Sequence, residues 1–219
     1  MMGRTFDPFL YLVTDRNLAG AQAVADIVAE AIAGGVTLVQ LREKSLSHVA
    51  FVNEARSLVE VCHRQGIPLI VNDSVDVAVE AGADGVHLGQ SDESPQEARA
   101  KLGLDAIIGL SVESVAQAQA AAALDIDYLA ASPVFATPTK TDTAPPLGLD
   151  GLRAIRRLCD KPLVAIGGMN LSNALDIFRA GADGIAVVSA LMAATDPRQA
   201  ARAFANLRSQ LDSWSGDAQ

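Results

Sequence analysis

The pentapeptide AGADG occurs at residues 81–85 and again at residues 180–184. In both places a run of helical character precedes it and a strand-like apolar run follows. Glycine after a helix supplies a left-handed cap, and small neighbouring residues allow the next strand to begin close by. The repeat therefore marks the same helix-to-strand turn in two halves of the chain and predicts that the halves are alike.

Short β-rich runs that end in polar residues alternate with longer helical runs, which is typical of βα units and a parallel sheet. The predicted strands cover residues 10–14, 37–42, 69–73, 85–88, 106–112, 128–134, 163–167 and 184–188. The predicted helical runs cover residues 23–33, 48–64, 115–124, 151–158, 172–180 and 198–211, with residues 95–101 as the weakest. Eight units with a half-repeat favour the α/β fold of a (β/α)8 TIM barrel, with an open doubly wound sheet as the alternative.

The chain has 219 residues, 50% of them hydrophobic, and no linker-like stretch divides it. This length suits one large core, so we expect a single barrel domain over residues 1–219, with a polar, frayed tail at about residues 213–219. Cys62 and Cys159 lack metal-ligand spacing and are expected to be reduced packing thiols.

The formal net charge of -9 argues against a nucleic-acid or anionic-membrane partner, because such partners need a basic face. Residues 1–10 lack the apolar core of a signal peptide, and no later window approaches a membrane-spanning length. We expect a cytoplasmic protein that acts on small molecules. The sequence leaves the oligomeric state open, a homo-oligomer included.

The stretch LVQLREK at residues 38–44 begins as a buried strand and ends in charge. Alternate side chains of a strand share a face, so Val39 and Leu41 are predicted to point one way and Gln40, Arg42 and Lys44 the other. An inward arginine costs several kcal/mol of desolvation unless it meets an anion. The pattern therefore predicts an anion-binding face.

The carboxyl ends of barrel strands form the active site of this fold, so the polar residues at the predicted strand ends are site candidates. They are Gln40, Arg42, Lys44, Asn72, Asp73, Gln90, Asp92, Ser111, Thr137, Pro138, Thr139, Lys140, Gly167, Gly168, Val188 and Ser189. Taken singly, each has an ordinary structural explanation: Asp73 as a helix cap, Asp92 as a solvated charge, Lys44 and Lys140 as surface lysines.

Taken together, the carboxylates Asp73 and Asp92 follow neighbouring strands and lie near cations, which favours a shared Mg²⁺ that also binds substrate phosphate. Gly167 and Gly168 expose backbone amides beside the last two strands, where barrels often bind phosphate. His87 is expected to be a satisfied interior group, and His48 and His63 are expected to be structural as well.

Residues 135–148 form the longest predicted loop, and a loop of this kind at a site is usually a lid or a binding segment. A Walker-type phosphate loop, a zinc-ligand cluster and a serine nucleophile elbow are missing from the sequence. The residues alone therefore predict a metal-assisted enzyme that acts on a phosphorylated or diphosphorylated small molecule.

Six stretches, in this order, resemble the thiamine-phosphate synthase family. They are YLVTD (11–15), VQLREK (39–44), VND (71–73), GVHLGQ (85–90), PVFATPTK (133–140) and AIGG (165–168). The resemblance extends over about residues 10–192 and implies a (β/α)8 barrel. It also implies a transferase that joins hydroxymethylpyrimidine diphosphate to a thiazole phosphate, plain or carboxylated, and releases diphosphate.

The resemblance implies a role for each matching position. Residues 40–44 (Gln40, Leu41, Arg42, Glu43, Lys44) with Asn72, Ser111 and Lys140 would bind the pyrimidine diphosphate, and Asp73 and Asp92 would bind Mg²⁺. Thr137, Pro138, Thr139, Gly168, Val188 and Ser189 would bind the thiazole phosphate. Arg42, Lys44, Lys140 and Ser111 would be catalytic, in a reaction that breaks the bond to diphosphate before the thiazole nitrogen attacks.

Two alternatives stay open at this point. A thiazole tautomerase is similar in fold but needs no diphosphate and metal site, and a non-catalytic barrel would bind thiazole phosphate without turnover. The intact set of Arg42, Lys44, Asp73, Asp92 and Lys140 argues for the synthase. Many relatives continue the fifth strand with Thr-His after the serine, whereas Val112-Glu113 follows Ser111 here, a change that removes no diphosphate or Mg²⁺ group.

Overall fold

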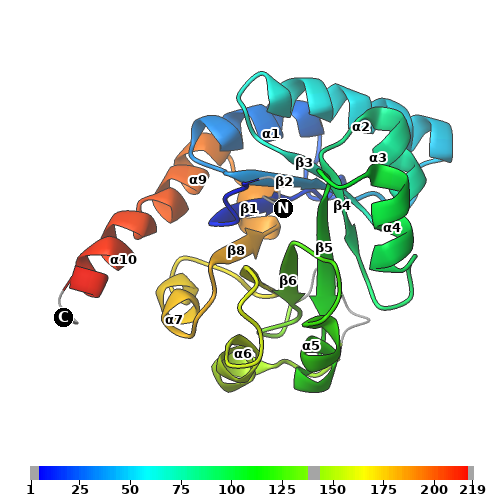
Figure 1. The fold of residues 1–219 in the computed structure, drawn as a ribbon. Coiled ribbons are helices and arrows are strands. Elements are labelled where there is room, and N and C mark those ends of the chain that lie inside the picture. The colour runs from blue at the N-terminus through cyan, green and yellow to red at the C-terminus, as the bar shows by residue number, and fades with distance from the viewer. Residues whose placement is uncertain (1–4, 138–143, 217–219) are drawn as a thin grey trace.

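Eight parallel strands close into a barrel with helices on its outside (Figure 1). The computed structural model describes residues 5–137 and 144–216. The strands are β1 (Leu10–Val13), β2 (Leu38–Leu41), β3 (Leu69–Asn72), β4 (Gly85–Leu88), β5 (Ile107–Val112), β6 (Tyr128–Ala131), β7 (Leu163–Ile166) and β8 (Gly184–Val187). Each strand pairs with the next, and β1 pairs with β8 in the register Tyr11↔Ala186. The predicted (β/α)8 barrel is confirmed, and the open-sheet alternative is wrong.

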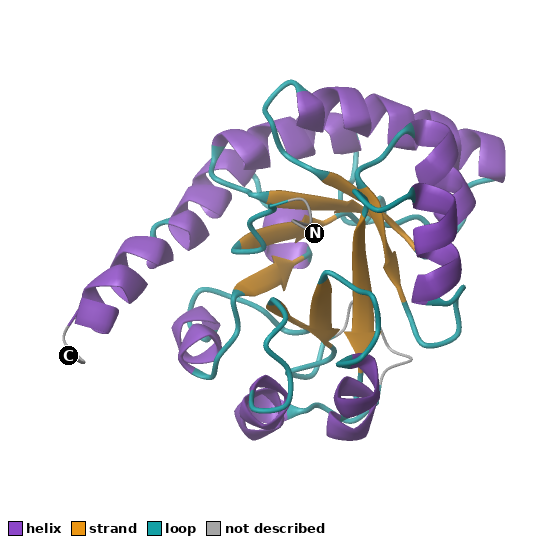
Figure 2. Ribbon diagram, in the orientation of Figure 1, coloured by secondary structure: helices purple, strands orange, loops and turns teal. Residues whose placement is uncertain are grey.

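Helices surround the strands as an outer layer (Figure 2). They are α1 (Val24–Ala33), α2 (His48–His63), α3 (Val75–Ala81), α4 (Pro95–Leu102), α5 (Val115–Ala121), α6 (Gly148–Arg156), α7 (Ala174–Arg179), α8 (Ser189–Met192), α9 (Pro197–Ala205) and α10 (Leu207–Gly216). Among these described helices, none combines the length and the hydrophobicity needed to cross a bilayer.

The structure adds to the predicted helices and corrects some of them. The weakest prediction, residues 95–101, is confirmed as α4, whose capping box pairs Ser94 with Glu97. The helical run expected before the first AGADG is α3, for which no bounds were predicted. The short helix α8 was not predicted, and the predicted run 198–211 divides into α9 and α10. Helix α10 extends to Gly216, so it includes residues 213–216 of the expected tail, and residues 217–219 lie outside the described residues.

The end of β6 differs most from its prediction, since the strand stops at Ala131 and not at residue 134. Pro133 has no amide hydrogen and interrupts the ladder. The backbone then rejoins β7, because the amide of Val134 donates to the carbonyl of Ile166 at 2.8 Å. The chain past β6 is therefore held against the barrel where the long predicted loop begins.

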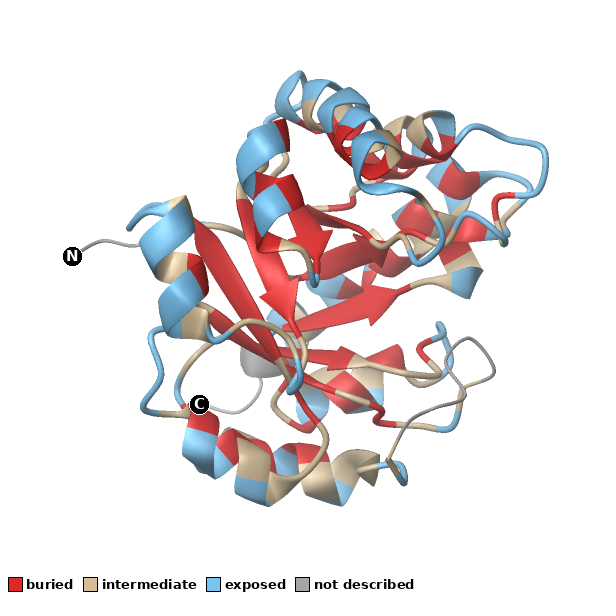
Figure 3. Cartoon of the chain, turned by 90° about the vertical axis from the view of Figure 1, so that its right-hand side faces the viewer, coloured by how far each residue is buried: buried red, intermediate tan, exposed pale blue. Residues whose placement is uncertain are grey.

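Alternation along the strands separates two apolar layers. Val39 and Leu41 belong to the layer between strands and helices, whereas Leu38 belongs to the barrel interior. Figure 3 shows the strands almost wholly buried and the outward faces of the helices exposed. The interior layer contains two buried phenols besides aliphatic side chains: Tyr11, Val13, Leu38, Ile70, Ile107, Tyr128, Ala130, Val164 and Ala186. Cys62 and Cys159 are buried free thiols, as expected.

Three aspartates, which we call the N-terminal rim aspartates, bind the backbone where strands begin. Their side-chain oxygens accept the amide hydrogens of Leu69, Ile108 and Leu163 at 2.9, 2.7 and 2.8 Å. Each aspartate also contacts one basic side chain. The pairs are Asp84 with His63 at 2.7 Å, Asp127 with Arg99 at 2.8 Å and Asp183 with Arg156 at 2.8 Å. They are Asp84, Asp127 and Asp183, the first and last of which belong to the AGADG repeat.

The last glycine of each repeat has no room for a side chain. A Cβ on Gly85 would collide with the carbonyl of Ile107, and one on Gly184 with the carbonyl of Pro8. Each repeat thus supplies an aspartate that ties a strand to its neighbour and a glycine that lets the neighbouring backbone approach.

Candidate active site

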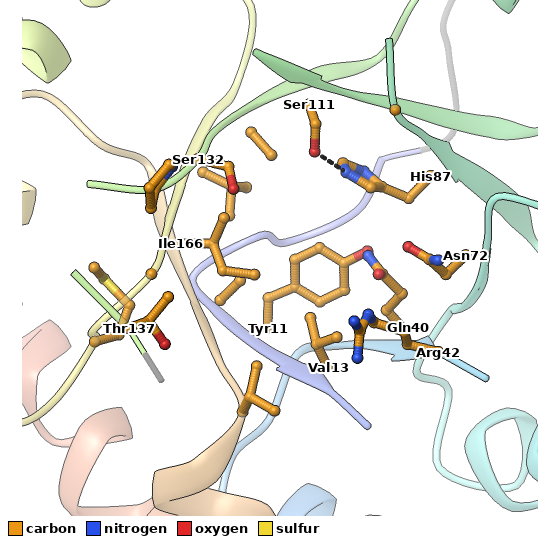
Figure 4. A pocket seen from close by; sticks show the side chains of 18 of the residues that line it. Tyr11, Val13, Gln40, Arg42, Asn72, His87, Ser111, Ser132, Thr137 and Ile166 are labelled. Carbon is orange, nitrogen blue, oxygen red and sulfur yellow. Dashed lines mark hydrogen bonds between the residues drawn. The ribbon is translucent and has the colours of Figure 1, made fainter. Parts of the chain in front are cut away.

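A cavity of about 760 Å³ opens at the carboxyl ends of the strands, and residues at or after all eight strands line it. Figure 4 shows Gln40, Arg42 and Asn72 on one side of it and Thr137 and Ile166 on the opposite side. This volume lies in the range of small-molecule sites, and its place is that of barrel active sites.

The cationic wall comes from the end of β2. Gln40, Arg42 and Lys44 line the cavity, in keeping with the predicted alternation. The main-chain amide of Arg42 donates to the Thr14 hydroxyl at 3.0 Å, and its guanidinium lies 3.6 Å from the carboxylate of Asp15. These contacts hold a positive charge at the mouth of the barrel.

Two predicted substrate-binding residues of the same stretch do not line the cavity. The Leu41 side chain lies in the layer between strands and helices. The Glu43 carboxylate accepts from the Arg16 guanidinium at 3.0 Å. Alternation along β2 explains the placement of Leu41, and Glu43 lies past the end of the strand, where it pairs with Arg16.

The Asp73 and Asp92 carboxyl groups lie next to each other on the cavity wall. Asp73 has a left-handed backbone (φ 65°), and its amide donates to the carbonyl of His87 at 2.8 Å. Asp92 accepts from the amide of Gly89 at 2.6 Å. Helix α3 is capped by Ser74, so capping does not explain Asp73.

The pKa of Asp73 is raised to about 6, first by partial burial and then by the charge and hydrogen bond of Asp92. A hydrogen bond from Asn72 and the charge of Arg42 offset part of this rise. Two carboxylates that repel each other fit a hard cation such as Mg²⁺. Among the described residues no three His, Cys, Asp or Glu side chains cluster as a metal site, so water and substrate oxygens would complete the coordination.

A chain of hydrogen bonds crosses the barrel interior beneath the cavity. The Tyr11 hydroxyl accepts from the Gln40 amide at 2.7 Å and lies 2.8 Å from the Tyr128 hydroxyl. His87 contacts the Ser111 hydroxyl through Nε2 at 2.8 Å (Figure 4). Its Nδ1 lies 2.9 Å from the Tyr128 hydroxyl. His87 is thus the buried, satisfied group that was expected, and it also lines the cavity.

The opposite wall comes from the ends of β7 and β8. Gly167 and Gly168 both have positive φ, 101° and 72°, and a Cβ on Gly168 would lie 2.9 Å from the carbonyl of Ala136. Gly168, Val188, Ser189 and Thr137 line the cavity here, although Ser189 begins α8 and does not close the strand. The structure therefore brings together all described residues predicted to bind the thiazole phosphate.

The predicted 135–148 loop is closed at its base. The amides of Leu147 and Gly148 donate to the carbonyls of Pro133 and Val134, each at 2.9 Å. Pro138, Thr139 and Lys140 lie outside the described residues. Their predicted roles remain predictions from sequence.

Sequence reasoning missed several lining residues, among them Tyr11, Ser132, Ile166, Met169 and Asn170. Alternation contained the signal for Tyr11 and Ile166, which face inward near strand ends. No comparable signal marks Ser132 or Asn170, since loop residues follow no period. Together with Val13 and Val188, Ile166 gives the cavity an apolar floor between its cationic and glycine-rich walls.

The chain was compared with known families and proteins. Residues 10–191 match the family model described as thiamine monophosphate synthase. The thiamine-phosphate synthase of Albidiferax ferrireducens is 55% identical over 192 residues, 88% of each chain. That of Azorhizobium caulinodans is 49% identical over 201 residues, 92% of this chain and 95% of the relative.

A solved structure, thiamine phosphate pyrophosphorylase from Pyrococcus furiosus, is similar with a TM-score of 0.85 and 36% identity. The similarity covers 94% of this chain and 97% of that one. The range matched by the family model, residues 10–191, includes every described residue that lines the cavity. The chain therefore belongs to the thiamine monophosphate synthase family.

Proposed function

We propose that the cavity binds hydroxymethylpyrimidine diphosphate and a thiazole phosphate together and joins them into thiamine phosphate, with release of diphosphate. The observation that carries this proposal is the arrangement of the two walls. Arg42, Lys44 and the Asp73 and Asp92 carboxyl groups line the same cavity as the glycine-rich wall of β7 and β8. An apolar floor separates the walls and suits two flat heterocycles.

On the cationic side, Gln40, Arg42, Lys44, Asn72 and Ser111 bind the pyrimidine diphosphate, with Lys140 added from its sequence position. Asp73 and Asp92 would hold Mg²⁺, which supplies positive charge to the diphosphate oxygens. On the other side, residues 137–139, Gly168, Val188 and Ser189 bind the thiazole phosphate. The Leu41 and Glu43 side chains take no part, because they point away from the cavity.

The reaction needs little covalent help from the protein. The carbon–oxygen bond to diphosphate breaks, and the thiazole nitrogen then donates its electron pair to the pyrimidine methylene carbon. Charge grows on the departing diphosphate, and Arg42 and Lys44 stabilise it because they are already in place. The apolar floor excludes water that would otherwise capture the carbon.

The test is thiamine phosphate formation by the purified protein with both substrates and Mg²⁺. A chelator is expected to abolish the product, and Arg42→Ala to lower turnover about 100-fold or more. Arg16→Ala is the matched control, since Arg16 pairs with Glu43 on the same stretch but does not line the cavity. Folded wild-type protein without product would overturn the proposal.

The net charge of -9 supports small-molecule substrates in preference to nucleic acid. A tautomerase would need no acidic pair, so the raised pKa of Asp73 beside Asp92 supports the synthase reaction. Lys140→Ala extends the test to the loop, and we expect a loss of turnover comparable to that of Arg42→Ala without unfolding.

A further inference from the structure

The hydrogen-bonded chain beneath the cavity joins residues from five different strands. It runs from Gln40 on β2 through Tyr11 on β1, Tyr128 on β6 and His87 on β4 to Ser111 on β5. Tyr11 and Tyr128 are at most 1% exposed. Burial raises the pKa of both phenols, so each keeps its single hydrogen at neutral pH.

The order of donors along this chain follows from counting hydrogens. The Gln40 amide nitrogen can only donate, so the Tyr11 oxygen accepts from it. The Tyr11 hydrogen must then go to the Tyr128 oxygen, because the opposite direction would leave the buried Tyr11 O–H without an acceptor among the residues that the structure describes.

The order of donors continues from Tyr128 to Ser111 at the cavity. With its oxygen accepting, Tyr128 donates its own hydrogen to His87 Nδ1, which is therefore unprotonated. The His87 hydrogen lies on Nε2 and is donated to the Ser111 oxygen. The hydroxyl hydrogen of Ser111 is then left to point into the cavity.

We propose that Tyr11, Tyr128 and His87 form a one-way hydrogen-bond relay that makes Ser111 a hydrogen-bond donor to the substrate. The three are positioning residues, which act on the substrate only through Ser111. The proposal rests on the proposed function, in which the Ser111 donor meets an oxygen of the departing diphosphate. Gly109 supports it independently, since a Cβ there would collide with the Tyr128 ring and displace its hydroxyl.

The first test is ¹⁵N NMR of the substrate-free protein labelled at histidine. The expected wild-type result is that His87 carries its hydrogen on Nε2. Tyr128→Phe removes the donor to Nδ1 and should produce a mixture of tautomers, whereas Tyr11→Phe leaves that donor and should keep the wild-type tautomer. His48 and His63, which pair with Glu80 and Asp84 on the surface, should not change in any variant.

The second test asks whether the relay acts through Ser111. We expect Tyr128→Phe to lower kcat about tenfold with KM nearly constant, because the Ser111 bond strengthens as charge develops. In a Ser111→Ala background, Tyr128→Phe should have no further effect on kcat. An equal loss in both backgrounds would show a merely structural role and overturn the relay.

A wild-type His87 with its hydrogen on Nδ1, or on both nitrogens, would overturn the proposal without any variant, even if Tyr128→Phe failed to fold. The NMR result also separates this proposal from the proposed function. A protein that forms no thiamine phosphate but shows the expected tautomers would retain the relay and lose the reaction.

Discussion

The two ends of the barrel use aspartate in opposite ways. At the N-terminal rim, Asp84, Asp127 and Asp183 each accept a backbone amide hydrogen and face a basic side chain. At the cavity, Asp73 and Asp92 face each other, and the pKa of Asp73 rises to about 6. Each N-terminal carboxylate faces a basic side chain of the chain itself, whereas the two cavity carboxylates face each other and are the pair proposed to hold Mg²⁺. In our proposal the same residue type therefore contributes stability at one end and ligand binding at the other.

The largest expected effect breaks the cavity side of this comparison. Asp92→Asn should lower kcat/KM about 100-fold or more, because it removes half of the anionic pair proposed to hold Mg²⁺. Mg²⁺ should raise the Tm of the wild-type protein but not that of the variant. A variant with wild-type turnover and a wild-type response to Mg²⁺ would remove Asp92 from the proposed metal site.

The next largest expected effect is a loss of stability when an N-terminal rim aspartate is replaced. Asp127→Asn weakens the contacts to the Ile108 amide and to Arg99, whose side chain is only 10% exposed. We expect the free energy of unfolding to fall by about 2 kcal/mol in urea titrations. The kcat of the folded fraction should stay at the wild-type value, and a loss of kcat at constant stability would contradict the division between the two ends.

A smaller expected effect is the pH dependence of stability that Asp73 causes. The pKa of Asp73 is about 6 in the fold and 3.8 without it, so the folded state binds this proton more tightly. Its contribution to stability is complete below pH 3.8 and is lost as the pH rises through about 6.

Asp73→Asn should therefore stabilise the metal-free protein by about 1 kcal/mol at pH 7.5, a figure reduced for solvent screening of an exposed group. The difference should vanish near pH 4 in urea titrations with a chelator. Asn suits the test because it tolerates the positive φ at this position. A wild-type protein more stable than the variant at pH 7.5 would show that the pair is already satisfied within the chain.

The smallest expected effect on stability comes from an ion pair that lies at neither end of the barrel. Arg198 pairs with Glu30 on the outer helices at 2.9 Å, and both side chains are 50% exposed. Arg198→Gln should change the free energy of unfolding by less than about 0.5 kcal/mol and leave turnover unchanged. A larger loss would mean that ion pairs matter here regardless of where they lie.

The strands could be predicted well from sequence, because apolar runs bounded by polar residues and AGADG turns follow local rules. The least accurate boundary, at β6, reflects Pro133, whose missing amide was visible in the sequence but was not weighed. The four-residue helix α8 was not predicted, and the seven-residue α3 was expected only as an unbounded run before the first AGADG, because such lengths show little helical period.

The candidate site could be predicted where a strand sets the direction of a side chain, as for Gln40 and Arg42. Leu41 and Glu43 were carried along by the resemblance, although the same alternation points them outward. The contact between Tyr11 and Tyr128 joins residues 117 positions apart and follows no local pattern. Side-chain networks of this kind depend on closure of the whole barrel.

The pairing of β1 with β8 has a consequence for synthesis of the chain. Of the eight barrel strands, β1 leaves the ribosome before the others and β8 after them, so β1 has an unpaired edge until β8 has emerged. The hydrogen bond between Tyr11 on β1 and Tyr128 on β6 can form only when both of these strands have joined the barrel. A nascent chain stalled before β8 therefore lacks the edge pairing that protects parallel strands from other chains.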